Sequence, residues 1–406
     1  MSLKVLKCGK MFDAENEQVL ENVMVFVKDN KVEKVCPYTE VLRDCEVVDL
    51  SDKFVTPGLI DCHVHLSSNG EANPNSTQKT LGDHAFFAMR MAQADLMAGF
   101  TSLRTVGDPG FVDVALRNAI DRGEVVGPRL MVSGPCLGTT GGHADSHYNP
   151  YLTESPLAAS GNIADGPDAM MKAARYNIKH GVDVLKFMST GGVMSKGTTV
   201  GAQQMTFEEM KAITDIANMY GVITSTHAHG TNGIKCAVKA GVTSVEHGMM
   251  LDDECIEEMA KRGTYLVPTI IAAERIIVMG SRAGIPEYMV EKAKQVLANH
   301  KNGVAKARAA GVKVAFGTDS GTPYNFHGKQ AYEFELMKDF GISPLEALTC
   351  ATKTAAELMR KNDTVGSITA GKYADIAAFD GDPREDITAM TRCVFVMKDG
   401  VVYKNN

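Results

Sequence analysis

Eight short apolar runs, each ending in polar or glycine residues, constrain the fold of this chain more than any other feature. They begin at Leu59, Thr101, Arg129, Val182, Val222, Thr243, Thr264 and Val312. Segments with helical periodicity follow most of them, and this alternation is typical of parallel strands connected by crossover helices. Eight such units favour a closed (β/α)8 barrel, or TIM barrel, over an open sheet. The sequence therefore predicts an α/β fold built on a barrel.

The two ends of the chain have a different pattern, with short strands and tight turns. The N-terminal strand-like segments are 22–27, 31–35 and 45–50, and strand patterning returns in the C-terminal part. We predict a small β-sandwich domain formed from both termini, residues 1–56 plus 362–406, with the barrel domain over residues 57–361. Residues 137–166 are rich in Gly, Ser and Asn and are expected to form a loop over the barrel mouth.

Two connecting helices carry boundary signals. Thr206 and Glu209 have the spacing of a capping box, and Gly221 is placed to end that helix. Ser343 and Glu346 repeat the spacing before a second helix. We expect both helices to begin with a reciprocal pair of cap hydrogen bonds.

Charge and cysteine content exclude several classes of protein. Among 406 residues, 42 Lys and Arg stand against 49 Asp and Glu, which gives a net charge of −7 without a basic cluster. This balance argues against a nucleic-acid partner. No apolar run approaches the ~18 residues of a membrane span, and no signal-peptide core is present. The nine cysteines are scattered without a CxxC pair, which fits reduced thiols, so we expect a soluble, cytoplasmic protein.

Histidine spacing gives the first functional signal. The chain has 11 His and two His-x-His pairs, whereas roughly 0.3 such pairs are expected by chance. His63 and His65 end the first apolar run, and side chains two apart in a strand point to the same side. Two converging imidazoles make half of a divalent metal site, while the alternative is a pair of hydrogen-bonded core histidines.

Four other runs end in residues that could act with this pair. They are Lys186, His227, His247 and Asp319. Each alone is compatible with an ordinary buried polar residue, but together they fall at strand C-termini, where barrel active sites are built. Lys186 could be a paired structural lysine or point outward. Next to bound cations, its amine could instead add CO2 and form a carbamate that bridges two metals.

Several motifs resemble the amidohydrolase superfamily of metal-dependent hydrolases. They are "VTPGLIDCHVHL", "VLKFMS", "THAHG", "VEHG", "FGTDSG" and "GSITAGKYADIAAFD", and they extend over nearly the whole chain. The lysine on the fourth strand combined with "HAHG" on the fifth is most similar to the imidazolonepropionase-related branch, which includes Xaa-Pro dipeptidases (prolidases). The resemblance implies hydrolysis of the amide bond of a dipeptide or N-acyl amino acid.

The resemblance also implies a binuclear metal centre. It assigns the more buried metal to His63, His65, Asp319 and N6-carboxylated Lys186, and the other metal to His227, His247 and the same Lys186. Zinc is the expected metal, and manganese or cobalt would suit the same N and O ligands. A metal-bridging hydroxide would attack the amide carbonyl, and Asp319 would serve as general acid and base.

Further residues are candidates for catalysis and substrate binding. His229 and His143 are expected to contact the substrate, with His229 also an alternative to His227 as ligand. Arg104 is a candidate anchor for a substrate carboxylate, and a structural ion pair is its alternative. His147 and Tyr148, on the same loop as His143, are weaker candidates. His84, His180 and His300 lie in helical stretches and are expected at the surface.

Rival functions remain open at this stage. One is a cyclic-amide (imidazolone-type) hydrolase or a deaminase; "HAHGTNG" lacks the Glu typical of one-metal deaminases, which argues against deamination only. A metal-free structural protein on the same fold is the non-enzyme alternative, and the complete set of ligand types argues against it. The expected partner is a small-molecule substrate, and a homo-oligomer is compatible with the resemblance.

Overall fold

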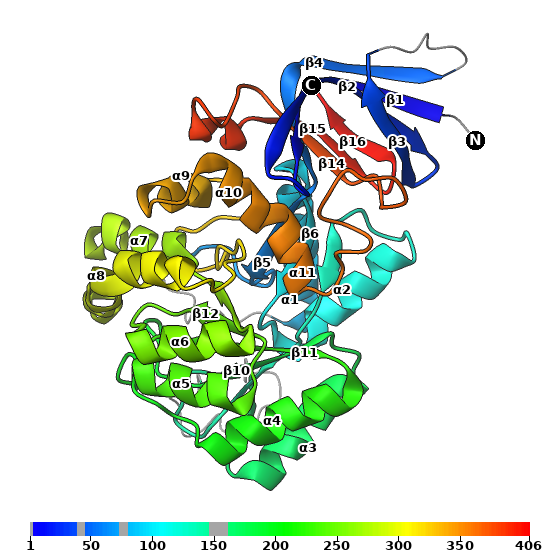
Figure 1. Ribbon diagram of the computed structural model, residues 1–406. Helices are drawn as coiled ribbons and strands as arrows, with labels where there is room; N and C mark the ends of the chain where they lie inside the picture. Colours follow the sequence, from blue (N-terminus) through cyan, green and yellow to red (C-terminus); the bar gives the residue numbers. More distant parts are fainter. Residues whose placement is uncertain (1–2, 39–44, 73–79, 146–160) are drawn as a thin grey trace.

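The computed structural model describes residues 3–38, 45–72, 80–145 and 161–406, and strands from both ends of the chain share one sheet (Figure 1). The strands are β1 (Leu3–Asp13), β2 (Gln18–Lys28), β3 (Lys31–Pro37), β4 (Glu46–Pro57), β14 (Ile376–Phe379), β15 (Cys393–Lys398) and β16 (Val401–Asn405), in the order β16-β15-β14-β4-β1-β2-β3. The N-terminal and C-terminal parts meet where β14 pairs antiparallel with β4. The sequence had indicated segments of β2, β3 and β4 but not β1.

The middle of the chain forms two parallel sheets. The first contains β5 (Leu59–Val64), β6 (Phe100–Thr105) and β7 (Arg129–Met131). The second runs β13-β12-β11-β10-β8-β9, with β8 (Cys136–Gly138), β9 (Gly161–Ile163), β10 (Val184–Met188), β11 (Ile223–Ala228), β12 (Ser244–His247) and β13 (Tyr265–Val267). The predicted α/β class with parallel strands is confirmed. The whole of β9 and all but the first residue of β8 lie inside the segment expected to be a loop.

Backbone hydrogen bonds link the two parallel sheets at both edges, directly at one edge and through the eighth apolar run at the other. On one side the Val184 amide donates to the Val132 carbonyl at 3.2 Å. On the other, the Ala315 amide donates to the Leu266 carbonyl and the Cys62 amide donates to the Phe316 carbonyl, both at 2.9 Å. The eighth apolar run therefore lies between β13 and β5, although it forms only isolated bridges and not a regular strand.

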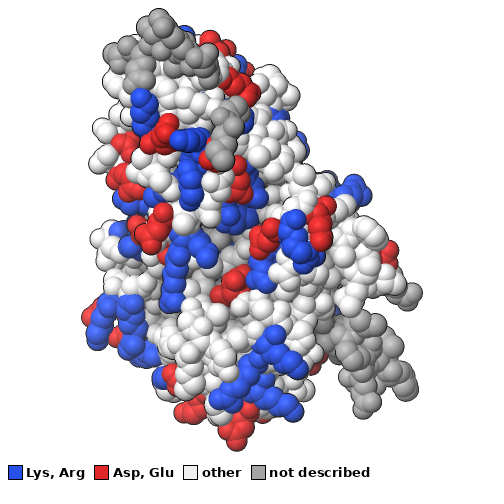
Figure 2. Space-filling view, turned by 90° about the vertical axis from the view of Figure 1, so that its right-hand side faces the viewer, with Lys and Arg blue, Asp and Glu red and all other residues white. Residues whose placement is uncertain are grey.

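Helices cover the parallel sheets on their outer side (Figure 1). They are α1 (Leu81–Met97), α2 (Val112–Asp121), α3 (Pro167–Lys179), α4 (Phe207–Tyr220), α5 (Thr231–Ala240), α6 (Asp253–Arg262), α7 (Ile270–Met279), α8 (Glu287–Ala309), α9 (Tyr332–Asp339), α10 (Pro344–Thr349) and α11 (Ala355–Leu358). No helix in the described part of the chain is long and apolar enough to span a membrane. Acidic and basic side chains are intermingled on the face shown in Figure 2.

The predicted helix caps are correct for α4 and half correct for α10. Thr206 and Glu209 form the full capping box, and α4 ends at Gly221 with φ of 73°. Ser343 accepts the Glu346 amide at 3.3 Å, but the Glu346 carboxylate pairs with Arg308 rather than returning to the cap. The second reciprocal box was therefore wrong, because a guanidinium from α8 offers that carboxylate a bidentate ion pair.

The strands that carry the candidate site residues have no exposed position. Every residue of β5, β6, β10, β11 and β12 is buried. Polar side chains on these strands need partners inside the protein, because an unpaired buried polar group is costly. The contacts of those polar side chains therefore define the site.

Candidate metal centre

His63, His65 and Asp319 form a compact group of candidate ligands at the end of β5. Nε2 of His63 lies 3.2 Å from Oδ1 of Asp319, and Nε2 of His65 lies 3.0 Å from the same oxygen. One ligand atom from each residue lies within 4.8 Å of the others. The carboxylate of Asp319, from the segment that follows α8, thus lies beside both His63 and His65.

Backbone contacts hold Asp319 beside the two histidines. Its amide donates to the His63 carbonyl at 2.7 Å, and its backbone is left-handed with φ of 60°. The neighbouring Thr318 hydroxyl donates to the carboxylate of Asp61, which also accepts the His63 amide. A left-handed backbone is uncommon for a residue with a Cβ and persists where surrounding contacts impose it.

The remaining ring nitrogens of His63 and His65 are already engaged. Nδ1 of His63 donates to Glu246 and Nδ1 of His65 donates to the Gly107 carbonyl, both at 2.8 Å. Each contact places the proton on Nδ1 and leaves the Nε2 lone pair for a cation. Although burial opposes it, the two histidines hold the pKa of Asp319 well below its ordinary value, so this carboxyl is an anion.

Three more histidines converge at the ends of β11 and β12. The ring centroid of His227 lies 4.6 Å from those of both His229 and His247. Burial lowers the pKa of His227 well below its ordinary range and that of His229 to about 3, so both rings are neutral. Neutral imidazole is the form that binds a metal ion.

Unpaired nitrogens on these rings fit a cation. Nε2 of His227 and Nδ1 of His229 are buried and have no hydrogen-bond partner among the described residues. His247 shares a hydrogen bond between Nδ1 and the Thr269 hydroxyl at 2.7 Å, which leaves its Nε2 available. Since unpaired buried nitrogens are costly, these donor atoms fit a divalent metal, with His227 and His247 as its candidate protein ligands.

Adjacent residues of β12 both turn toward the site. In a regular strand Glu246 and His247 would face opposite sides. His247 instead adopts a left-handed backbone with φ of 70°, which breaks the alternation. Glu246 can therefore contact His63 while the His247 ring lies 5.0 Å from the His63 ring, centroid to centroid.

Lys186 lies in the centre of β10 and is 1% exposed. It pairs in register with Ser225 of β11, two residues before His227. Among the described residues its ammonium has no ion pair or hydrogen bond, and burial lowers its pKa despite the charges of Glu246 and Asp319. Lys186 is therefore not paired with any described residue, although a paired lysine was one of the structural alternatives.

Arg104 is fully buried in a network with Glu246. Its Nη2 lies 2.7 Å from the Glu246 carboxylate, its Nη1 donates to the Ser244 hydroxyl at 2.9 Å, and its Nε donates to the Cys62 carbonyl at 2.6 Å. With all three nitrogens engaged, Arg104 corresponds to the structural ion pair rather than to the substrate anchor. Glu246 was not among the sequence candidates, although it directly precedes His247 in "VEHG".

His143 reaches the same site from the segment after β8. Its ring centroid lies 4.2 Å from that of His227, and its Nδ1 contacts the Ser195 hydroxyl at 2.9 Å. Burial lowers the pKa of His143 to about 4, so its ring is neutral. His147 and Tyr148, the other candidates on this segment, lie outside the described residues.

Two other histidines, His300 and His327, are also buried and have defined neighbours. His300 was expected at the surface but is fully buried on α8, with its ring centroid 5.3 Å from that of Phe340. His327, to which the sequence assigned no role, pairs through Nδ1 with Asp95 at 2.8 Å and contacts the His65 carbonyl through Nε2 at 3.1 Å. His327 thereby holds the backbone of His65, a candidate ligand, through its carbonyl group.

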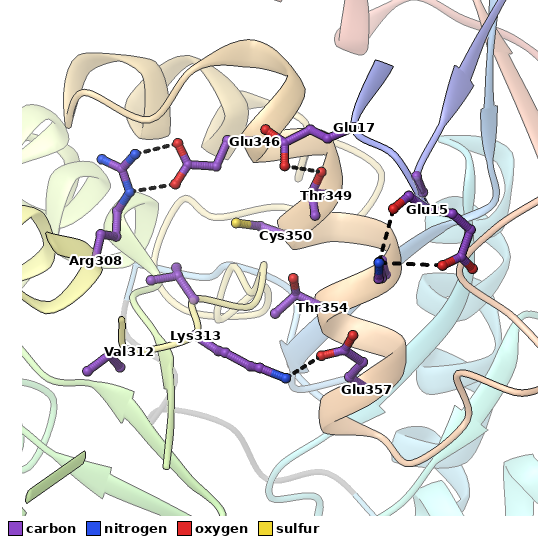
Figure 3. A pocket seen from close by; sticks show the side chains of 13 residues that line it. Glu15, Glu17, Arg308, Val312, Lys313, Glu346, Thr349, Cys350, Thr354 and Glu357 are labelled. Carbon is purple, nitrogen blue, oxygen red and sulfur yellow. Dashed lines mark hydrogen bonds and ion pairs between the residues drawn. The ribbon is translucent and has the colours of Figure 1, made fainter. Parts of the chain in front are cut away.

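A separate cavity of about 330 Å³ lies away from these histidines (Figure 3). It is bordered by charged side chains that are already paired, including Arg308 with Glu346 and Lys313 with Glu357. None of the candidate site residues lines it. The histidine cluster therefore remains the candidate site.

Comparisons with known proteins agree with this arrangement. An ochratoxinase from Aspergillus niger is 31% identical over 372 residues, covering 86% of this chain and 75% of that protein. An imidazolonepropionase from Fusobacterium nucleatum is 24% identical over 400 residues, covering 90% and 87%. The crystal structure of a Xaa-Pro dipeptidase with bound methionine matches with a TM-score of 0.92 and 35% identity over the full length of both chains. The family model for the amidohydrolase family matches residues 54–403, so this chain belongs to the amidohydrolase family.

Proposed function

We propose that this protein is a binuclear, zinc-dependent amidohydrolase that cleaves the amide bond of dipeptides or N-acyl amino acids. The observation that carries the proposal is the convergence of two donor groups. The His247 ring lies 5.0 Å from that of His63 and 4.6 Å from that of His227, centroid to centroid, and His227 keeps an unpaired ring nitrogen. The similarity to a Xaa-Pro dipeptidase and to an ochratoxinase supports this substrate class.

The proposal includes the architecture that holds the two groups together. The eight strand segments would form a closed (β/α)8 barrel over residues 57–361, and residues 1–56 plus 362–406 would form the β-sandwich domain. The hydrogen bond from Val184 to Val132 joins the two parallel sheets at one edge, and the bonds from Cys62 to Phe316 and from Ala315 to Leu266 join them at the other through the eighth run, which supports closure.

Two sets of residues would hold the metal ions. One ion would bind to His63, His65 and Asp319, the other to His227 and His247, and Lys186 as its carbamate would bind to both. The lowered pKa of Lys186 supports carbamate formation, because burial favours the neutral amine that reacts with CO2. When bound, divalent metal supplies Lewis-acid activation of the amide carbonyl and of water.

The protein's own residues would move the proton and hold the substrate. Oδ1 of Asp319 faces both histidines, so its Oδ2 is the atom placed to take a proton from the attacking water and pass it to the leaving nitrogen. His143 and His229, as neutral rings, would hydrogen-bond the substrate carbonyl and carboxylate without carrying charge into the site.

Metal analysis combined with a substrate panel tests the proposal. The protein would be purified with added zinc and bicarbonate, and its metal content measured by mass spectrometry. We expect about two equivalents of zinc, and hydrolysis within a panel of Xaa-Pro and other dipeptides, N-acyl amino acids and an imidazolone ring compound. Fewer than about one equivalent of metal would contradict the enzyme reading. Turnover of the ring compound alone would identify a cyclic-amide hydrolase instead.

A further inference from the structure

The side chain of Lys292 on α8 binds the backbone of the segment that connects β10 to α4. Its Nζ donates to three carbonyls, those of Gly192 at 3.2 Å, Ser195 at 2.6 Å and Thr198 at 2.6 Å. One turn earlier on the same helix, the Tyr288 hydroxyl donates to the Met194 carbonyl at 3.1 Å. The helix thus holds residues 192–198 through four backbone carbonyls.

The ammonium of Lys292 is matched to this task. An ammonium has three donors and no acceptor, and all three are taken by carbonyls. Among the described residues no carboxylate lies within ion-pair distance of Lys292, whereas Lys294, two residues on, pairs with Glu291 at 2.8 Å. Hydrogen bonds from a charged donor are about twice as strong as neutral ones. The charged side chain of Lys292 therefore stabilises the backbone of this segment and not an ion pair.

The same segment contacts the ring of His143 at two residues. The Ser195 hydroxyl contacts Nδ1 of His143 at 2.9 Å. The Gly192 backbone passes so close that a Cβ there would lie 2.3 Å from Cε1 of the ring. Both of these residues also offer their carbonyls to Lys292.

We infer that Lys292 is a positioning residue for His143. It fixes the segment 192–198, the segment fixes the ring, and the ring lies 4.2 Å from that of His227, centroid to centroid. The inference rests on the proposed function in assigning His143 a contact with substrate. The mechanical part, that Lys292 orders the segment and the ring, is independent of which substrate is used.

Two measurements that need no activity test the mechanical part. Lys292→Met keeps the side-chain length and removes the three donors. We expect faster hydrogen–deuterium exchange in residues 190–201 and faster carbethoxylation of His143 by diethyl pyrocarbonate, both read by peptide mass spectrometry. Lys294→Met, on the same helix and exposed, should match the wild type in both. Wild-type exchange and wild-type His143 reactivity in Lys292→Met would overturn the inference.

A second variant keeps the inference testable if Lys292→Met does not fold. Gly192→Ala leaves Lys292 in place and puts a methyl group where the His143 ring lies. We expect it to raise the carbethoxylation rate of His143 while leaving zinc content at the wild-type level. An unchanged rate in Gly192→Ala would show that the segment does not hold the ring.

A double-mutant cycle tests the consequence for catalysis. With a dipeptide that the wild type hydrolyses, we expect Lys292→Met to lower kcat roughly tenfold or more without loss of zinc, as for other residues that orient a functional group. In a His143→Ala background the same change should have no further effect. If Lys292→Met lowered kcat by the same factor in the His143→Ala background as in the wild type, Lys292 would not act through His143. If the wild type hydrolyses no member of the panel, the proposed function fails, while the exchange and carbethoxylation results still decide the role of Lys292.

Discussion

The carboxylate of Glu246 accepts a hydrogen bond from Nδ1 of His63 at 2.8 Å, and this contact determines which nitrogen of His63 faces Asp319. Both side chains are at most 1% exposed. Arg104 lies on the other oxygen of Glu246, so a buried carboxylate is shared between a guanidinium and a candidate metal ligand. The orientation of the His63 ring, a candidate metal ligand, thus depends on an ion pair in the core.

Removing the cation from this network should be strongly destabilising. Arg104→Met leaves the Glu246 carboxylate buried without its counter-charge, which typically costs ~3–5 kcal/mol. We expect a loss of that order in the free energy of unfolding, measured by urea denaturation. Arg122→Met, which removes an exposed ion pair with Glu124, is the control and should leave the free energy of unfolding nearly unchanged. An equal change in the free energy of unfolding for the two variants would mean that the buried network stabilises the fold no more than the exposed ion pair does.

Lys186 is expected to be required for loading two metal ions. Lys186→Ala removes the amine that would form the bridging carbamate, so bound zinc should fall below two equivalents and hydrolysis should be lost. Metal content by mass spectrometry and turnover of the best panel substrate measure this. Added acetate or propionate, as a free carboxylate, should partly restore activity. Near-normal turnover in Lys186→Ala would exclude the bridging carbamate.

Replacing the two histidines of "THAHG", His227 and His229, should have different effects on zinc content and on turnover. His227→Ala is expected to lower zinc content, because its unpaired Nε2 is the candidate ligand atom. His229→Ala should keep the metal and lower turnover, since its ring is assigned to the substrate. Zinc analysis of both variants, purified side by side, decides the assignment. Metal loss in His229→Ala with retention in His227→Ala would exchange the two roles.

His300 should make stability depend on pH. Burial lowers its pKa to about 4, whereas an exposed histidine in the unfolded chain has a pKa of about 6.5. As pH falls from 6.5 toward 4, the unfolded chain takes up the proton first, so the stabilisation from His300 is present above that window and lost within it. Between pH 7 and pH 5 the free energy of unfolding should therefore fall by about 1–2 kcal/mol less in His300→Leu than in the wild type.

Urea denaturation at the two pH values measures this difference. Met289→Leu is the matched control, because it alters a buried apolar side chain on the same helix, about three turns from His300, without removing a titratable group. Its pH dependence should equal that of the wild type. The same equality in His300→Leu would mean that His300 does not take up its proton in this range.

Strand alternation and motif position were sufficient to predict part of the site. His63 and His65 could be placed together because residues two apart share a side of a strand, and Asp319 because its motif follows the last apolar run. Glu246 could not be found in this way. Its side chain and that of His247 reach the same site only because His247 has a positive φ, which no local pattern of side chains encodes.

Other differences arise from contacts between elements far apart in the sequence. Helical periodicity located His300 on a helix but not the face that packs against Phe340. The cap spacing at Ser343 was read correctly, but the ion pair of Glu346 with Arg308 lies outside the local sequence. Likewise, Arg104 could be assigned to a strand, while its partner Glu246 comes from another strand.

The pairing of β4 with β14 bears on the order in which the chain can mature during synthesis. Only Gly58 separates β4 from β5, the strand of His63, and Pro57 at the end of β4 pairs with Ile376. A growing chain emerges from the ribosome in sequence order, so one edge of β4 has no neighbour until β14 has been made. An unpaired edge is a site for unwanted association. The pairing that anchors β5, the strand of the candidate ligand His63, is therefore completed among the last events of biosynthesis, and slow translation of the intervening helices would prolong the exposure of that edge.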